Sequence, residues 1–229
     1  MKYLIKHAAS FPILEIELDE GERILSQPNS MLSMSAGIRL TARVGRRGSK
    51  GGWLSGFKNM LGGESLFTTE YTAKRAGQTV TLSPDSFGEI LTITLDEEHS
   101  YFLTAGSYLA NTGDCELGIK YGGVKGVMAK KGLFLLHAKG TGTVFCQTYG
   151  AIEKRELVPE EVFIVDNRFV VAFSDTVKYQ LVKASENLKD SFVSGEGLVN
   201  RYTGPGVVYY QTRAKPSYGV FGTIFRAMT

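Results

Sequence analysis

Three charged residues occupy matching places in a recurring sequence pattern, and they are the first candidates for chemistry. Glu64, Lys131 and Glu196 each stand two residues before a leucine that begins a strand-like segment. A lysine between two carboxylates could form a structural ion-pair network, hold a ligand, or belong to three separately solvated charges. Catalysis by the two carboxylates would need a close approach and a raised pKa, which only the fold can provide. These three residues are therefore a candidate axial charge cluster with an open role.

The other reactive residue types lack the spacing that catalysis or metal binding needs. No G-x-S-x-G motif is present, and His7, His99 and His137 are scattered along the chain. We interpret His137 as a structural histidine. Cys115 and Cys146 have no C-x-x-C spacing, so we expect two buried free thiols, with a disulfide as the alternative. The sequence favours a protein that is not an enzyme and has no cofactor or metal.

A second candidate is a basic stretch around the single tryptophan. It contains Arg46, Arg47, Lys50, Trp53, Phe57 and Lys58. Apolar residues between Trp53 and Leu61 fall on one face of a short predicted helix, which is too short to be stable alone and must dock on its own sheet, a partner or a membrane surface. Basic side chains beside an aromatic ring can also bind RNA or a phosphate ligand. The net charge of +3 is too small to indicate a dedicated nucleic-acid-binding protein.

The segments that must position these residues have the composition and pattern of β-strands. Twenty-seven glycines and eleven tyrosines, with only six prolines, suit many turns between aromatic and β-branched strands. Apolar and polar residues alternate, as in half-buried strands, over residues 14–19, 38–44, 91–95 and 177–181. The 229 residues fit one large all-β domain as well as two smaller domains.

A strand–turn–strand pattern occurs three times. Its copies begin at Leu66, Leu133 and Leu198, which stand 67 and then 65 residues apart. We read each copy as a hairpin, with turns at 75–77, 141–143 and 204–206. Recurrence at a nearly constant spacing predicts three copies of one supersecondary unit.

The repeats predict an all-β fold of three tandem units in a pseudo-threefold arrangement, with short helical inserts. Its single compact domain would span residues 1–213, with repeats of about 1–84, 85–158 and 159–213, followed by an apolar C-terminal tail at 214–229. Units of this size bury little alone, so we expect them to pack against one another and to cover their edge strands.

Several segments resemble one known family. Residues 63–67, the junction from Pro84 to Ile90, and residues 195–213 are similar to signature segments of the altered inheritance of mitochondria 24 family, and the resemblance covers roughly residues 1–213. It implies a duplicated β-sandwich or double-stranded β-helix in which each repeat is similar to a subunit of the trp RNA-binding attenuation protein. It implies no established activity for bacterial-type members.

The resemblance does not carry a location to this chain. Mitochondrial members of the family are associated with inner-membrane organisation, but we find no leader rich in Arg and Ser at the N-terminus. No run reaches the roughly 18 apolar residues that span a bilayer, so we expect no transmembrane segment. We therefore expect a cytoplasmic protein.

Two functional hypotheses follow. The first is a non-enzymatic interaction or scaffold protein that associates with itself or another protein through the Trp53 helix, exposed sheet edges and the tail residues Phe221 and Phe225. The alternative is a small-ligand or RNA-binding module that uses the basic-aromatic region from Arg46 to Lys58. Peripheral membrane contact is left open, and nucleic acid is the less favoured partner.

The first hypothesis predicts that replacing both Trp53 and Phe57 with Ser abolishes assembly, because the apolar face of the helix is lost, while the fold is retained. Light scattering would report the assembly and circular dichroism the fold. An unchanged assembly state would count against this helix as the contact.

Overall fold

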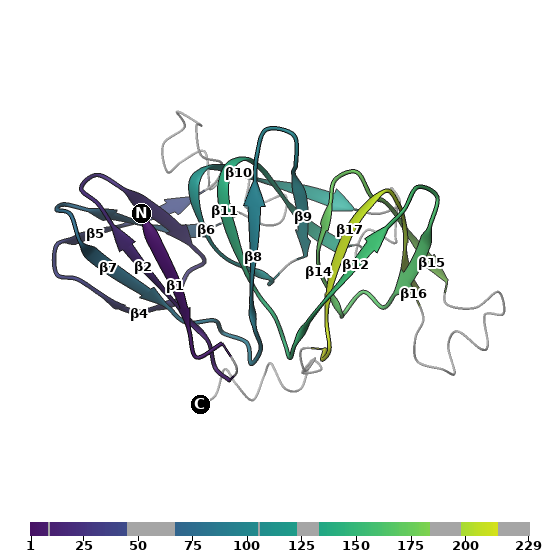
Figure 1. Ribbon diagram of the computed structural model, residues 1–229, viewed down its shortest axis with the longest axis horizontal. Coiled ribbons are helices and arrows are strands. Elements are labelled where there is room, and N and C mark those ends of the chain that lie inside the picture. The colour runs from purple at the N-terminus through teal and green to yellow at the C-terminus, as the bar shows by residue number, and fades with distance from the viewer. Residues whose placement is uncertain (9, 45–66, 105, 123–132, 184–197, 215–229) are drawn as a thin grey trace.

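The described part of the chain consists of strands joined by turns and loops. The computed structural model describes residues 1–8, 10–44, 67–104, 106–122, 133–183 and 198–214, which form strands β1 to β17 and no helix (Figure 1). The all-β prediction is confirmed. The predicted helix at Trp53–Leu61 and the other inserts lie outside the described residues.

The first unit is a sandwich of two sheets. It contains β2 (Ile13–Leu18), β3 (Arg23–Ser26), β4 (Met31–Met34), β5 (Ile38–Val44), β6 (Phe67–Ala73) and β7 (Gln78–Leu82), with β1 (Lys2–Lys6) added beside β2. Strands β2, β7 and β4 form one sheet, while β3, β6 and β5 are neighbours in the other. The alternation that predicted β2 buries Leu14, Ile16 and Leu18 against residues of the opposite sheet such as Tyr71.

The third unit has the same strand order. It contains β12 (Ile152–Leu157), β13 (Val162–Val165), β14 (Val170–Ser174), β15 (Lys178–Lys183), β16 (Leu198–Thr203) and β17 (Gly206–Gln211). Strands β12, β17 and β14 correspond to β2, β7 and β4, and strands β13, β16 and β15 correspond to β3, β6 and β5. Phe173, Tyr202 and Val208 fill its core. Because β12 pairs with β17, this unit begins at Ile152, ahead of the boundary expected near Pro159.

The second unit builds the same arrangement from fewer, longer strands. It contains β8 (Ile90–Leu95), β9 (Tyr101–Thr104), β10 (Tyr108–Gly122) and β11 (Leu133–Gln147). β8 pairs with Gly142–Gln147 of β11, whereas β9 pairs with Leu135–Ala138 of the same strand. The two long strands therefore cross from one layer to the other, and each takes the place of two strands in the other units.

Glycines allow this crossing. Gly113, Gly140 and Gly142 have φ values of 72°, 97° and 139°, in the region that L side chains rarely adopt. A Cβ atom on Gly142 would lie 2.2 Å from the carbonyl oxygen of Thr112 on the paired strand. The paired strands β10 and β11 can thus bend here only because their backbones approach each other without side chains between them.

The three predicted hairpins are strands, but their predicted pairing is wrong. β6 and β7 follow each other in sequence and lie in different sheets, as do β16 and β17, and residues 141–143 lie inside the continuous strand β11. At each position the chain passes from one layer of the sandwich into the other, because both flanking strands direct apolar side chains into a shared core. Alternation shows which face of a strand is buried, but it does not identify the neighbouring strand.

The units lie in a row, with the second between the first and the third (Figure 1). In the described ranges, strand pairs join unit 1 to unit 2 and unit 2 to unit 3, and none joins unit 1 to unit 3. Packing of all three inner faces around one axis therefore stays a prediction.

Glutamine side chains tie the links between units to the sheets. The side-chain oxygen of Gln147 accepts the N–H of Asp85 at 2.9 Å, and that of Gln211 accepts the N–H of Tyr149 at 2.8 Å. Each glutamine ends the last strand of its unit and is buried. Both links are thus held by partly buried hydrogen bonds to buried glutamine side chains, whose oxygens would be costly to leave without a donor.

The two cysteines lie in the core of the second unit. Cys115 and Cys146 are both buried and are not joined in a disulfide, which confirms the expectation of two thiols. Burial raises the pKa of the Cys146 thiol to about 12. Cys146 therefore offers no reactive thiolate at neutral pH.

Gly142→Ala tests the bend in β11. We expect the free energy of unfolding to fall by about 2–3 kcal/mol, because the new methyl group meets a carbonyl oxygen and φ is strained. Thermal unfolding should show a Tm lower by roughly 4–12 °C in a chain of this size. Gly118→Ala, on the paired strand with nothing within 4 Å of the added Cβ, is the matched control and should change stability by less than about 1 kcal/mol.

The buried thiols predict resistance to alkylation. At pH 8 a thiol with a pKa of about 12 is ionised in only about one molecule in 10⁴, and burial also blocks the reagent. Mass spectrometry should find the native protein unmodified by iodoacetamide, and both cysteines modified after unfolding in guanidinium. Labelling of the native protein as fast as that of the unfolded chain would contradict the buried placement.

Candidate functional site

The contacts between units show how an edge strand of one unit pairs with an edge strand of the next. At the first junction β3 pairs with β10, so that Leu25 lies opposite Asn111. At the second junction β9 pairs with β14, so that Phe102 lies opposite Phe173. In both cases the second strand of one unit pairs antiparallel with the third strand of the next unit. The sheet therefore continues from one unit into its neighbour.

The third strands of the three units share one register. In each of them a bulge interrupts the pairing, after Met31 in β4, after Tyr108 in β10 and after Val170 in β14. Beyond the bulge each strand faces a fully buried valine, with Met34 opposite Val80, Asn111 opposite Val144 and Phe173 opposite Val208. Met34, Asn111 and Phe173 are therefore structurally equivalent.

Equivalent residues are buried at the junctions and exposed on β4. The bulge residue is 0% exposed at Leu109 and 1% exposed at Val171, whereas Leu32 of β4 is 57% exposed. All four residues of β4 are exposed. Full burial of a Leu or Met side chain contributes about 1.5–3 kcal/mol, so β4 leaves part of this stabilisation unused. In the part of the chain that the structure describes, β4 has a partner strand on one side only.

The second strand of the last unit is open in the complementary way. β13 corresponds to β3 and β9, whose outer edges are occupied at the two junctions, but it pairs only with β16 among the described strands. Its residue Ile164 is 57% exposed, and Val162 is exposed as well. We call β4 and β13 the open edges. They belong to units at opposite ends of the molecule (Figure 1).

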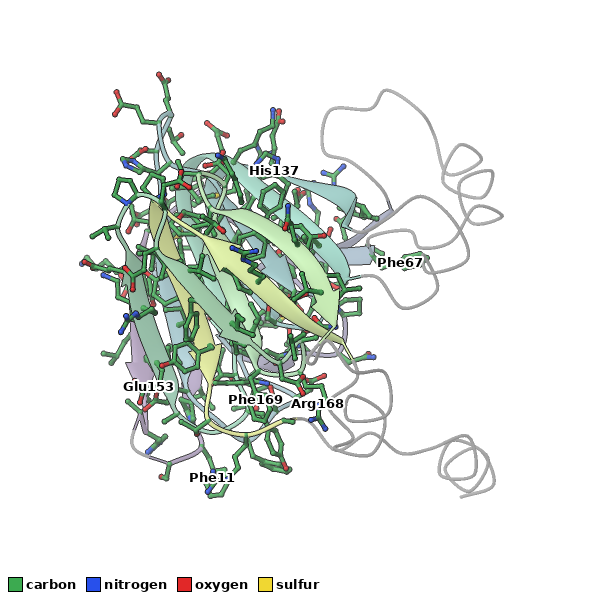
Figure 2. All side chains as sticks on the ribbon, turned by 90° about the vertical axis from the view of Figure 1, so that its right-hand side faces the viewer. Phe11, Phe67, His137, Glu153, Arg168 and Phe169 are labelled. Atoms are coloured by element: carbon green, nitrogen blue, oxygen red, sulfur yellow. The ribbon has the colours of Figure 1, made fainter. Side chains whose placement is uncertain are left out.

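A pocket of about 260 Å³ lies among the loops that precede β2, β8 and β12. Phe11, Phe87, Glu89 and Gly150 are among its lining residues. The Phe11 and Phe87 rings meet edge to face with centroids 6.2 Å apart, and Phe11 has a φ of 77°. Figure 2 shows Phe11 at the lower edge of the molecule. The Glu89 carboxylate accepts the N–H of Ile152 at 2.7 Å, while the two exposed aromatic rings give the pocket an apolar face.

The fold also brings together a serine, a histidine and an aspartate that are far apart in sequence. The Ser100 hydroxyl lies 3.0 Å from Nε2 of His137 and donates a hydrogen bond to the Asp175 carboxylate. His137, labelled in Figure 2, stacks on Phe102 at 4.7 Å. A nucleophilic serine needs its proton accepted by the histidine and the carboxylate behind the histidine. Here the carboxylate binds the serine instead, so the cluster is arranged as a polar link beside the β9–β14 junction.

The residues that the sequence nominated lie outside the described ranges. They are Arg46, Arg47, Lys50, Trp53, Phe57, Lys58, Glu64, Lys131, Glu196, Phe221 and Phe225. Their roles stay predictions. Arg43, at the start of the basic cluster, is described and forms an ion pair of 2.8 Å with the buried Glu70. That guanidinium is therefore engaged within the fold.

From the sequence we expected exposed sheet edges but did not identify β4 and β13 as those edges, and we missed the Ser100 cluster. One signal for the open edges was present, because Met31–Met34 is mostly apolar but does not alternate with the expected period of two. Such a strand is poorly explained by one buried face and one solvated face. The Ser100 cluster had no comparable signal, since its members come from three separate segments.

No helix in the described ranges is both long and apolar enough to cross a membrane. Across those same ranges, no group of three or more His, Cys, Asp or Glu side chains is placed to hold a metal ion.

Comparison with known proteins identifies relatives over almost the whole chain. The sequence model of a family described as mitochondrial biogenesis AIM24 matches residues 3–213. An uncharacterized protein of Streptococcus pyogenes serotype M6 is 29% identical over 216 residues, which cover 93% of this chain and 86% of the relative. A crystal structure of a Streptococcus pyogenes protein from a structural genomics programme superposes with a TM-score of 0.76 and 25% identity, over 100% of this chain and 99% of the other.

Proposed function

We propose that this chain, which belongs to the mitochondrial biogenesis AIM24 family, is a non-enzymatic scaffold protein that associates with itself or with another protein. The observation that carries the proposal is the pair of open edges, β4 and β13, with their exposed apolar side chains. An edge strand offers a row of backbone donors and acceptors to a further strand, and exposed apolar residues add burial to that pairing. Scaffolding is therefore the role that the described surface supports best.

The chemistry of the described residues supports a role without catalysis. The Ser100 hydroxyl donates to Asp175 and is not aligned for attack. Burial raises the pKa of the Cys146 thiol, which opposes formation of a nucleophilic thiolate. The Glu89 carboxylate in the pocket accepts a backbone N–H from Ile152, which is a structural use of that group.

A small-ligand module is the second candidate, and the pocket beside Phe11 and Phe87 is the observation that favours it. Two exposed aromatic rings around a concave site can hold an apolar group of a ligand or of a partner side chain. The RNA-binding version of this alternative rests on Arg46–Lys58, outside the described residues. A cytoplasmic location is part of the proposal.

The mass of the protein in solution tests the scaffold role. Light scattering over a range of concentrations should give a mass above the 25.1 kDa of one chain, because burial of the open edges favours association. A protein that stays at the mass of one chain at every concentration would contradict self-association and direct attention to the pocket.

A chain that ends at Lys215 serves as the comparison in the same experiment. Assembly that dissolves on truncation would assign the contact to the tail residues Phe221 and Phe225. Assembly that persists would assign it to residues 1–215.

A further inference from the structure

The strand pairs that join the units indicate which partner fits the open edges. Two junctions inside the chain join a second strand to a third strand, β3 to β10 and β9 to β14. A third pair of the same kind, β13 and β4, is present in each chain, but its members lie in units at opposite ends of the molecule (Figure 1). One chain cannot pair these two strands with each other in this arrangement. Two chains can.

We propose that copies of this chain assemble head to tail, with β13 of one copy pairing antiparallel with β4 of the next copy as an extension of the row of units. This proposal rests on the proposed function and names its partner, a second copy of the same chain. Each contact would repeat the two junctions already present inside the chain. The sheets would then continue from the third unit of one copy into the first unit of another.

The internal junctions give the register of the new contact. Asn111 lies opposite Leu25 at the first junction, and Phe173 lies opposite Phe102 at the second. Met34 is equivalent to Asn111 and Phe173 because all three face a buried valine just beyond the bulge.

The second strands can be aligned in the same way. Leu25 follows Ile24, which is paired with the buried Tyr71, and Ile164 follows Phe163, which is paired with the buried Tyr202. Ile164 thus corresponds to Leu25, and the register places Met34 of one copy opposite Ile164 of the next.

Exposure and side-chain chemistry agree with this register. Met34 and Ile164 are both exposed and apolar in the single chain, whereas Phe173, the equivalent of Met34 at the second junction, is fully buried. Leu32 would occupy the place of Leu109 and Val171, which are buried beside their junctions. The contact would therefore bury residues from both edges together and leave neither apolar strand facing water.

The two surfaces in each contact are different, which makes the assembly heterologous. Such a contact leaves one β4 and one β13 free at the ends of every open assembly. The assembly can add further copies until the row closes into a ring or no free chains remain. A twofold dimer that pairs β4 with β4, or β13 with β13, would stop at two copies.

Two lysine substitutions separate these arrangements. Met34→Lys and Ile164→Lys each place a charge on one open edge, a substitution that blocks strand addition. Each variant alone should lose assembly and have the mass of one chain, because every copy lacks one of the two complementary edges. An equimolar mixture should form a dimer of one Met34→Lys copy and one Ile164→Lys copy, and nothing larger. Leu4→Lys on β1 is the matched control, since Leu4 is 56% exposed on an edge strand that no junction uses; this variant should assemble like the wild type.

A cysteine pair supplies a second readout that does not depend on the lysine variants folding. Met34→Cys and Ile164→Cys in separate copies should form an intermolecular disulfide under mild oxidation when mixed, and the bond should disappear with reductant. Cys115 and Cys146 are buried and should not interfere.

The outcomes distinguish this proposal from the proposed function. Wild-type protein that assembles, with both lysine variants still assembling like it, would overturn the head-to-tail contact and leave the scaffold role standing. A mixture of the lysine variants that stays at the mass of one chain, together with the absence of a cross-link, would also overturn it. Wild-type protein that never exceeds the mass of one chain would contradict both proposals.

Discussion

Antiparallel pairing between the second strand of one unit and the third strand of the next is the interaction on which the described structure depends. It joins unit 1 to unit 2 through β3 and β10, and unit 2 to unit 3 through β9 and β14. Each unit alone is a small sandwich that buries little surface, and its edge strands carry unsatisfied backbone groups. The pairing covers these edges and places the cores in a continuous row. The same requirement, applied to the ends of the row, explains why β4 and β13 are the informative surfaces.

The repeated register shows that the three units pack their third strand in the same way. Val80, Val144 and Val208 are all fully buried and face the third strand of their unit just beyond a bulge. Around this constant feature the chain varies the connection between the two layers. In unit 2 the glycines at 140 and 142 let one strand cross both layers, whereas units 1 and 3 use two strands joined by a turn. The topology is therefore more uniform than the element boundaries suggest.

The candidate functional features follow from the same organisation. Polar groups gather at the junctions, where Ser100 links His137 with Asp175 and where Gln147 holds the link before β8. These groups are engaged in binding one segment of the chain to another, which is a structural use of residue types that elsewhere perform catalysis. The exposed apolar strands at the two ends of the row are the surfaces on which association would depend. This distribution, with Ser100 and Gln147 engaged within the fold and apolar side chains exposed on the open edges, is the basis of the scaffold proposal.

Much of the fold could be predicted from the sequence, because it depends on local pattern. Alternation located β2, β5 and β8, and the many glycines and tyrosines with few prolines indicated an all-β chain. The recurring motif indicated three similar segments, and the resemblance of several segments indicated the family, which the match over residues 3–213 confirms. Two buried free thiols were also expected because the cysteines lack C-x-x-C spacing, and Cys115 and Cys146 are buried and free.

Tertiary structure decided which strands are neighbours and which edges stay open. The sequence placed β6 beside β7 and β16 beside β17, but these strands lie in different sheets. A strand's pattern specifies its two faces, whereas its partners depend on contacts between residues far apart in the chain. The sequence of Met31–Met34 does not show whether this strand is central or at an edge. The registers of the three units show that the equivalent residues on β10 and β14 are buried. For the same reason the sequence determined that this is a β protein with a recurring strand pattern, and the fold determined which strand edges are left open among the described strands.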